Sequence, residues 1–335
     1  MLRPLFTKAP IGLALVALTL LWPHATRAET LKLRYGQAYS AARSIFSLPV
    51  AIAEREGFFA REGLSVEVLQ PIPGGADHQI AALHNDNVDL THVATPFLIR
   101  AALAGSDAVA IAAEFRNPIY SVIAKPEIAS FVDLKGKLVG LADEYGTITL
   151  STRKLMALHG LNRGEFGARV IEGTSGRLAC LRRGDCDAVV IGQPQDLIAL
   201  EQGYRSLGDT TEAVPELLYT VTAARRSWAQ ANKEAVLRYV SALAGAFKFI
   251  RDGVNRDRVV RVVMESINTS EKIARQTMAL FFQPERGVLP ERGEIDLAGL
   301  AQVIALVGEA GTIKPPLPDA EQFVDLQYLR AAGVQ

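Results

Sequence analysis

Small polar residues and glycines recur directly after short apolar runs, where a strand would end and a helix would begin. These positions are Gly74-Gly75, Thr95, Gly146-Thr147 with Thr149, Ser175-Gly176 and Gln193. The first N–H groups of a helix lack partners within it and lie at its positive end, so they attract anionic or polar groups. Each residue alone could simply cap its own helix. Because they recur at the same end of successive strands, the set predicts a binding pocket.

Two arginines and several tyrosines could add to this pocket. Arg43 and Ser44 lie in a polar loop after the first expected strand, and Arg116 follows a later strand. A guanidinium can bind a carboxylate, sulfonate or phosphate through two parallel hydrogen bonds, although either arginine could equally be exposed and solvated. Aromatic rings that could flank a planar ligand, or pack in the core instead, belong to Tyr39, Tyr120, Tyr145 and Tyr219.

The sequence lacks the motifs of several other chemistries. Its histidines are not at metal-ligand spacing, so no structural zinc is predicted. There is no nucleophile elbow, no Gly-x-Gly-x-x-Gly and no phosphate-binding Walker loop. Asp143 and Glu144 are adjacent, so their side chains point in different directions rather than facing one bond. No basic run indicates nucleic acid. We therefore expect neither a cofactor nor an enzyme.

The elements that must position these residues begin with one unit from Leu31 to Leu69. Leu31–Tyr35 alternates apolar and basic residues, as a half-buried strand does. A helix is predicted from Leu48, with Pro49 in its first turn, and Ser65–Leu69 returns as a strand. Ligands of open α/β sheets bind at the carboxyl ends of parallel strands, which is where the first loop lies.

Strand and helix then continue to alternate, which predicts doubly wound parallel sheets. Further strands are expected at Val88–Val93, Val109–Ala113, Leu138–Ala142, Arg169–Ile171 and Ala188–Ile191. Helices are expected at Thr95–Ala104, Thr147–His159, Arg177–Arg182, 233–250 after Asn232 as cap, Arg258–Glu265, Glu271–Phe282, Asp296–Val307 and Asp319–Leu329. Asn117-Pro118 interrupts a strand and suggests a crossing to a second lobe. We expect an α/β protein with lobe 1 at 29–117 plus 220–335 and lobe 2 inserted at 118–219.

Two stretches resemble a known family. One is Pro49-x-x-x-Ala53 followed by Gly57-Phe58-Phe59-x-x-Glu62-Gly63-Leu64, and the other is Asp133-Leu134-Lys135-Gly136-Lys137. Both resemble the periplasmic substrate-binding proteins of ABC importers for sulfonates, taurine, nitrate and thiamine-precursor pyrimidines. The resemblance implies a type II periplasmic-binding-protein fold, with a ligand cleft between two lobes and two hinge crossings. It also implies a small-molecule ligand, an ABC permease in the inner membrane as partner, and a monomer.

The same resemblance implies roles for individual residues. Gln37 matches a polar residue after the first strand, and Gly75 a glycine that lets the backbone approach the ligand. The helix starts that match are Thr95 in lobe 1 and Gly146, Thr147 and Thr149 in lobe 2. Gln193-Pro194 matches a turn in which sulfonate binders carry a tryptophan. Gly192 stands in its place here, so the match does not extend to that sulfonate-binding feature.

The first 28 residues read as a Sec signal peptide. Arg3 and Lys8 precede the apolar run from Ile11 to Leu21, and Ala28 offers a small residue for cleavage. A membrane span needs about 20 apolar residues, more than this run supplies. No cysteine lies near the cleavage site, so we expect a soluble periplasmic protein and not a lipoprotein. Alternatives are a periplasmic sensor that presents its ligand to a receptor, or an enzyme of pyrimidine or menaquinone biosynthesis on the same fold.

Two cysteines, Cys180 and Cys186, are separated by a short turn that contains Gly184. In an exported protein an even number of cysteines favours pairing, and the glycine gives the turn the freedom to bring them together. We expect a disulfide that staples lobe 2. Two free thiols, one on a helix and one entering a strand, are the alternative.

Overall fold

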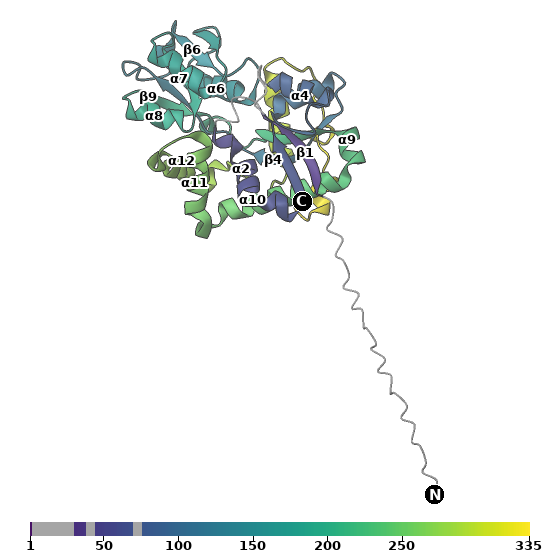
Figure 1. Ribbon diagram of the computed structural model, residues 1–335. Coiled ribbons are helices and arrows are strands. Elements are labelled where there is room, and N and C mark those ends of the chain that lie inside the picture. Colours follow the sequence, from purple (N-terminus) through teal and green to yellow (C-terminus); the bar gives the residue numbers. More distant parts are fainter. Residues whose placement is uncertain (2–29, 38–43, 70–75) are drawn as a thin grey trace.

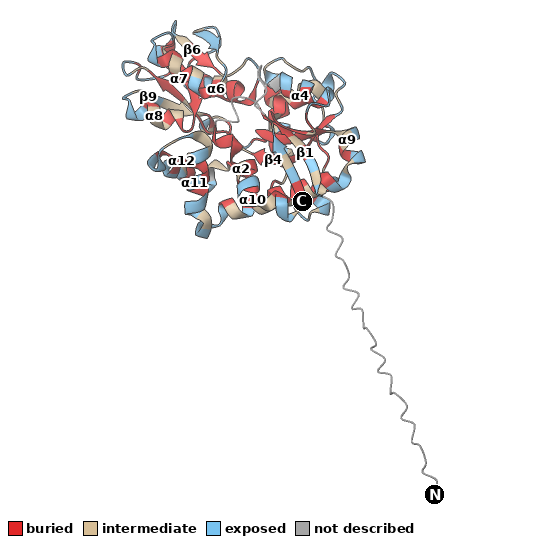
Figure 2. Ribbon diagram, in the orientation of Figure 1, coloured by how far each residue is buried: buried red, intermediate tan, exposed pale blue. Residues whose placement is uncertain are grey.

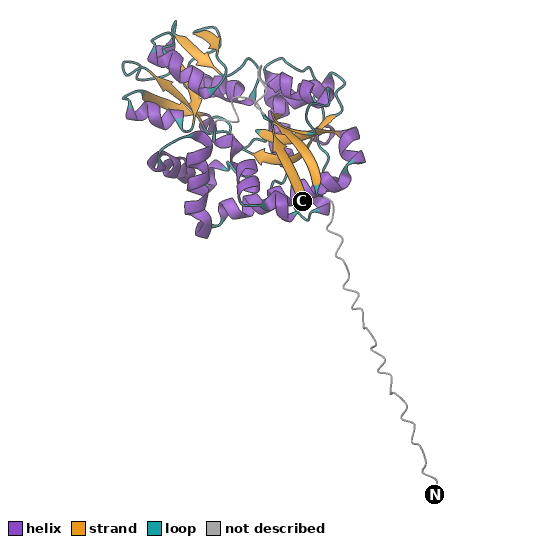
Figure 3. Cartoon of the chain, viewed as in Figure 1, coloured by secondary structure: helices purple, strands orange, loops and turns teal. Residues whose placement is uncertain are grey.

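The computed structural model of the protein describes residue 1 and residues 30–37, 44–69 and 76–335. These residues form two five-stranded sheets with helices packed around each, and the two sheets lie side by side (Figure 1, Figure 3). The expected signal peptide and the predicted site residues Arg43 and Gly75 lie outside the described residues.

The first sheet has the strand order β2-β1-β3-β10-β4. Its strands are β1 (Leu31–Gly36), β2 (Leu64–Val68), β3 (Leu90–Ala94), β4 (Ala108–Phe115) and β10 (Thr220–Arg225). Strand β1 pairs in parallel with β2 and β3. All eight residues of β4 are buried, which explains why seven of them are apolar; the exception is Glu114.

The second sheet has the order β7-β6-β8-β5-β9. Its strands are β5 (Tyr120–Ala124), β6 (Leu138–Leu141), β7 (Gly167–Val170), β8 (Ala188–Gly192) and β9 (Arg205–Asp209). The prediction of purely parallel sheets is wrong, because β10 runs antiparallel to β3 and β4, and β5 runs antiparallel to β8 and β9. These two strands enter from the other half of the chain, so no helical crossover within the sheet forces them to be parallel.

The chain passes between the sheets twice, at 116–119 and again at 210–219. Asn117 Nδ2 in the first connection donates hydrogen bonds to the carbonyl oxygen of Pro215 in the second and, at 2.9 Å, to that of Arg286. Thr210 Oγ1 donates to the carbonyl oxygen of Pro118 at 2.9 Å. The two connections are therefore bonded to each other as well as to the C-terminal region.

Helices surround both sheets. The helices of the N-terminal part are η1 (Ile45–Ser47), α2 (Leu48–Arg55), α3 (Phe58–Arg61), α4 (Ala76–His84) and α5 (Thr95–Leu103). Next come η2 (Val132–Leu134), α6 (Thr147–Leu158), α7 (Thr174–Arg182), α8 (Gln195–Glu201) and η3 (Thr210–Glu212). The C-terminal part contains α9 (Arg226–Ala231), α10 (Lys233–Arg251), η4 (Gly253–Asn255), α11 (Arg256–Ile267), α12 (Glu271–Phe281), η5 (Pro284–Arg286), α13 (Leu297–Glu309), η6 (Ala320–Phe323) and α14 (Gln327–Ala331).

Two helix predictions in the C-terminal part are wrong in detail. The expected helix at Asp319–Leu329 is divided into η6 and α14, because Val324 between them makes a parallel bridge with Ala110 at the edge of the first sheet. Asn232 precedes α10 but its side chain does not cap that helix. Its Nδ2 instead donates to the carbonyl oxygen of Trp228 at 2.9 Å, at the end of α9.

The main core packs around the first sheet and continues into the second sheet, where it includes Val122, Val139 and Val190; buried residues are red in Figure 2. Helix α10 contributes Tyr239 and Phe247, both fully buried. A smaller cluster in the second half surrounds a disulfide between Cys180 and Cys186, whose Cα atoms are 5.4 Å apart. Within the described ranges, every helix is too short or too polar to cross a membrane.

Candidate functional site

A cavity of about 120 Å³ lies between the two sheets. We call the first sheet with its helices the first half of the molecule, and the second sheet with its helices the second half. The first half contributes Phe46, Gln79, His92, Val93, Ala94, Phe97, Tyr219 and Thr220 to the wall. From the second half it is lined by Tyr120, Ala142, Asp143, Thr147, Ile148, Glu172, Gly173 and Arg177. Both halves of the molecule therefore form its walls.

The strand ends of both sheets bring these residues together. Strand β3 ends at Ala94 and leads directly into α5, whose Phe97 faces the cavity. Strand β6 ends at Leu141, and the short loop after it carries Asp143 to the start of α6 at Thr147. The carboxyl ends of two parallel strands, one from each sheet, thus face the same space, which is where open α/β sheets bind ligands.

Three aromatic rings form one wall. Phe46 and Tyr120 stack with their ring centroids 5.8 Å apart and their planes 3° from parallel. Tyr219 meets Phe46 edge-to-face at 5.2 Å. Phe46 belongs to the first half and Tyr120 begins β5, so this contact joins the two halves. The rings offer a planar apolar surface to a ligand.

Three buried polar atoms on lining residues have no hydrogen-bond partner within the described chain. They are Gln79 Nε2, Thr147 Oγ1 and Thr220 Oγ1. Gln79 is held through its Oε1, which accepts a hydrogen bond from Thr91 Oγ1 at 2.9 Å. A buried polar group without a partner costs about 1–3 kcal/mol, so each of these atoms favours a ligand that hydrogen-bonds to it.

The second half adds the buried Arg177 and the half-buried Asp143. The guanidinium of Arg177 donates to the carbonyl oxygens of Ile171, at 2.9 Å, and Val190, and burial lowers its pKa. Burial also raises the pKa of Asp143, although hydrogen bonds from Gly146 and Thr149 and the charge of Arg177 oppose the rise. Both Asp143 and Arg177 are thus already hydrogen-bonded to the protein.

Gly146 fixes the position of the Asp143 carboxyl group. Its backbone N–H donates to Asp143 Oδ1 at 2.6 Å. A Cβ atom on Gly146 would lie only 2.3 Å from Asp143 Oδ2, so no larger residue fits without moving that carboxyl group. Thr149 Oγ1 donates to the Asp143 carbonyl oxygen at 3.0 Å, which closes the turn before α6. Of the sequence-predicted residues at this helix start, Thr147 alone lines the cavity itself.

Tyr120 and Tyr219, two of the tyrosines predicted to flank a ligand, also lie on the cavity wall. Thr95, at the start of α5, does not line the cavity; its hydroxyl donates to the carbonyl oxygen of Leu218 at 2.6 Å and so ties α5 to the segment before β10. Arg116 forms an ion pair with Asp296 at 2.6 Å and does not line the cavity. Its charge therefore orders the C-terminal region.

The two described residues of the first loop lie elsewhere. Gln37 is buried at the end of β1 and lines a separate depression together with Ser47 and Ser266. Ser44 Oγ accepts a hydrogen bond from the backbone N–H of Phe46 at 3.3 Å and so caps η1. Ser44 thereby helps to set the position of the Phe46 ring in the cavity wall.

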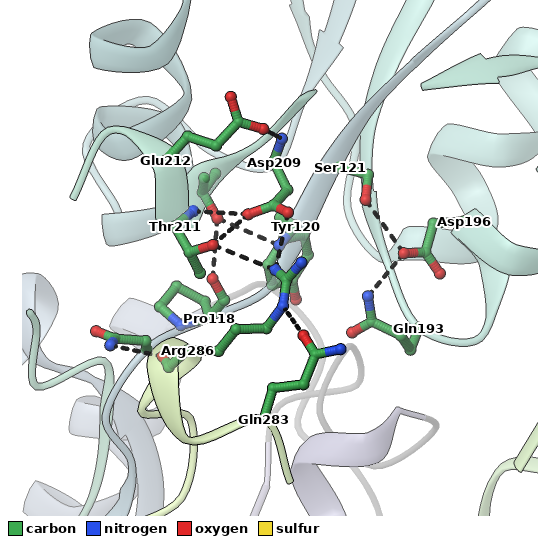
Figure 4. Close-up of polar contacts among 12 residues, drawn as sticks. Pro118, Tyr120, Ser121, Gln193, Asp196, Asp209, Thr211, Glu212, Gln283 and Arg286 are labelled. Carbon is green, nitrogen blue, oxygen red and sulfur yellow. Dashed lines mark hydrogen bonds and ion pairs between the residues drawn. The ribbon is translucent and has the colours of Figure 1, made fainter. Parts of the chain in front are cut away.

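Gln193 belongs to a neighbouring polar group in the second half (Figure 4). Its Nε2 donates to Asp196 Oδ2 at 2.6 Å, while its Oε1 is buried without a partner in the described structure. Ser121 Oγ donates to the same carboxylate oxygen at 3.2 Å. Burial raises the pKa of Asp196 to about 6, in spite of these hydrogen bonds.

Figure 4 also shows a contact between the halves that the sequence did not reveal. Arg286 of η5 forms an ion pair with Asp209, at the end of β9, over 2.8 Å. It also donates to Thr211 Oγ1 at 3.2 Å and to Gln283 Oε1. These bonds lie at the second connection between the sheets, where a relative motion of the halves would be centred.

Sequence reasoning missed several lining residues, among them Gln79, His92, Phe97, Glu172 and Arg177. A signal existed for His92, because a titratable residue stands in a strand whose neighbours are all apolar or small. No local signal marks Arg177, whose burial depends on carbonyl groups of two other elements. In the parts of the chain that the structure describes, no group of three or more His, Cys, Asp or Glu side chains could hold a metal ion.

Two mixed sheets joined by two connections, with a cavity between them, are the architecture of the periplasmic binding proteins. The structure has a TM-score of 0.75 to the ligand-binding component of an ABC-type import system from Staphylococcus aureus, with 13% identity over 91% of this chain and 100% of that one. The alkanesulfonate-binding protein SsuA from Xanthomonas axonopodis gives a TM-score of 0.70, with 16% identity over 88% of this chain and 98% of that one. At these identities the similarity shows the fold, which is the periplasmic binding protein fold.

The sequence identifies the family. The model of the family described as NMT1/THI5 like matches residues 46–254, so this chain belongs to the NMT1/THI5-like family. A Haemophilus influenzae protein named for thiamine biosynthesis is 32% identical over 93 residues, which are 27% of this chain. The match spans 29% of the length of that relative.

Proposed function

We propose that the protein is the periplasmic solute-binding component of an ABC importer. It captures a small polar or anionic organic molecule in the cavity between the sheets and delivers it to a permease in the inner membrane. The observation that carries the proposal is the set of buried, unpartnered polar atoms on both walls: Gln79 Nε2 and Thr220 Oγ1 on one, Thr147 Oγ1 on the other. A ligand that bonds to both walls stabilises the form in which they face each other.

Within this proposal, residues 29–117 with 220–335 and residues 118–219 act as two lobes. Exposed ion pairs between them are Lys154–Glu309 at 3.4 Å and Lys272–Glu201 at 2.6 Å. Exposed pairs of this kind contribute about 0–1 kcal/mol each, so they leave the balance between open and closed forms to the ligand. Export is the second part of the proposal, and the apolar run from Ile11 to Leu21 after two basic residues supports it.

The experiment is to identify what the protein carries. Protein purified from a periplasmic extract is analysed by native mass spectrometry, and the compound released on denaturation is identified. We expect one bound small molecule per chain, and a raised melting temperature when it is added back to stripped, refolded protein. If neither this compound nor a panel of organic anions, amines and pyrimidines raises the melting temperature, the proposal is wrong.

The same sample distinguishes binding from catalysis. A binding protein returns the compound chemically unchanged after prolonged incubation, with the same mass and the same amount. A product of different mass, formed in proportion to protein and time, would instead assign an enzyme on this fold. The similarity to a protein named for thiamine biosynthesis makes this control necessary.

A further inference from the structure

A buried carboxylate lies directly behind one cavity residue, His92. Glu114 on β4 is fully buried, and its Oε2 lies 2.5 Å from His92 Nδ1. Its Oε1 accepts hydrogen bonds from the hydroxyl groups of Tyr35, at 2.8 Å, and Thr222, at 2.6 Å. Burial disfavours the charge on Glu114, but the charge of His92 and the three hydrogen bonds outweigh it and lower the pKa of Glu114.

These contacts determine which nitrogen of His92 meets the cavity. Because Glu114 accepts a hydrogen bond from Nδ1, that nitrogen carries a proton, and the orientation of the ring is fixed. Nε2 has no hydrogen-bond partner in the described part of the protein. His92 is the basic group in contact with this fully buried carboxylate. Nε2 is therefore the ring nitrogen of His92 that remains for a ligand.

We propose that His92 is a ligand-binding residue and that Glu114 positions it. The inference rests on the proposed function and adds the chemistry that the first half recognises. Nε2 of His92 and the unpartnered Nε2 of Gln79, which is a donor, belong to residues of the same wall. The ligand therefore presents to this wall an acceptor atom for the Gln79 amide and, beside it, a polar group that hydrogen-bonds to Nε2 of His92.

A purely structural role for Glu114 makes a different prediction, and Tyr35 distinguishes the two. Tyr35→Phe removes a hydrogen bond from the same carboxylate but leaves the bond to His92. If Glu114 only stabilises the fold, loss of either bond affects binding similarly. If Glu114 positions His92, Glu114→Gln weakens ligand binding and Tyr35→Phe does not.

The test uses the full exported chain with ¹⁵N-labelled histidine. The ring nitrogen resonances of His92 are recorded without ligand in wild type, Glu114→Gln and Tyr35→Phe. Affinity is measured calorimetrically for stripped, refolded protein, with the compound released from the wild-type protein as probe. We expect Glu114→Gln to shift the His92 nitrogen resonances and weaken binding about tenfold or more, as the loss of a hydrogen bond to a charged group does. Tyr35→Phe should lower the melting temperature yet keep both the resonances and the affinity.

A double variant, His92→Gln with Glu114→Gln, leaves no buried charge and so tests the inference if the single variant does not fold. It should bind as weakly as Glu114→Gln, because the two residues act as a unit. Unchanged affinity in the folded variants, or equal weakening by Tyr35→Phe, overturns the inference while the proposed function stands. If the wild type binds no compound at all, the proposed function fails, and the inference fails with it.

Discussion

Replacing Asp196 with asparagine should stabilise the protein at neutral and alkaline pH. Asp196 is 3% exposed, and its pKa is raised from 3.8 to about 6, first by burial. The folded state therefore holds this proton more tightly than the unfolded chain. Asp196 does not affect the free energy of unfolding below about pH 4. Its ionisation lowers that free energy as the pH rises from about 4 to 6, and the loss stays constant above that. At 1.36 kcal/mol per pH unit, ionised Asp196 costs about 3 kcal/mol.

The asparagine amide can replace the carboxylate if the Gln193 amide flips and the Ser121 hydroxyl accepts a hydrogen bond where it now donates one. Its oxygen can still accept from the backbone N–H of Leu197, as Asp196 Oδ1 does at 2.7 Å. Its nitrogen would face Gln193, whose Oε1 is buried and unpartnered, so a flip of the Gln193 amide provides an acceptor. We therefore expect Asp196→Asn to gain up to about 3 kcal/mol at pH 8 and nothing at pH 4.

Urea unfolding of wild type and variant at pH 4 and pH 8 measures this difference. The control is Asp319→Asn, which changes an exposed carboxyl group without a capping hydrogen bond and should alter stability little at either pH. A variant that is less stable than wild type by the same amount at both pH values would refute the reasoning, because burial of a charge would then not be what Asp196 contributes.

Three further predictions follow from local features. Replacing Cys180 and Cys186 with serine should lower the free energy of unfolding by about 2 kcal/mol, because the short closed loop restricts the unfolded chain only modestly. The wild type should show no reactive thiol when it is denatured without reductant. Gly299→Ala should lower the free energy of unfolding by about 1–3 kcal/mol, since its Cβ would lie 2.7 Å from the carbonyl carbon of Leu217. Gly253→Ala, whose Cβ would have nothing within 4 Å, is the control in the same urea titration. Sequencing of the exported protein should start near Glu29, and an intact Met1 would contradict export by a cleaved signal.

Local patterns predicted most of the elements that build the site. The alternation in Leu31–Tyr35 and the proline at position 49 predicted β1 and α2, and both are present. The directions of β5 and β10 could not be predicted in this way. Side-chain period is the same in parallel and antiparallel strands, so it carries no information about direction.

Cavity-lining residues could be predicted where their position in a helix brings them to the cavity. They could not be predicted where partners far along the chain determine their position. Thr147 is at a helix start in any fold that keeps α6, and it lines the cavity. Arg116 looked equally suitable, but its partner Asp296 lies 180 residues further along the chain and holds it away from the cavity. His92 matters because of Glu114, on a strand with which β3 does not pair. Such contacts exist only once the sheets are assembled.

The central claim, that the ligand binds in the cavity between the sheets, is tested most directly by Thr147→Val. The Thr147 hydroxyl has no partner in the described protein, so valine should not lower the melting temperature. Thr277→Val on α12 also replaces a buried, unpartnered hydroxyl, but away from the cavity, and is the matched control. Calorimetric titration with the compound that co-purifies should show about fivefold to tenfold weaker binding for Thr147→Val and none of this loss for Thr277→Val. Equal affinities for the two variants and the wild type would contradict the claim.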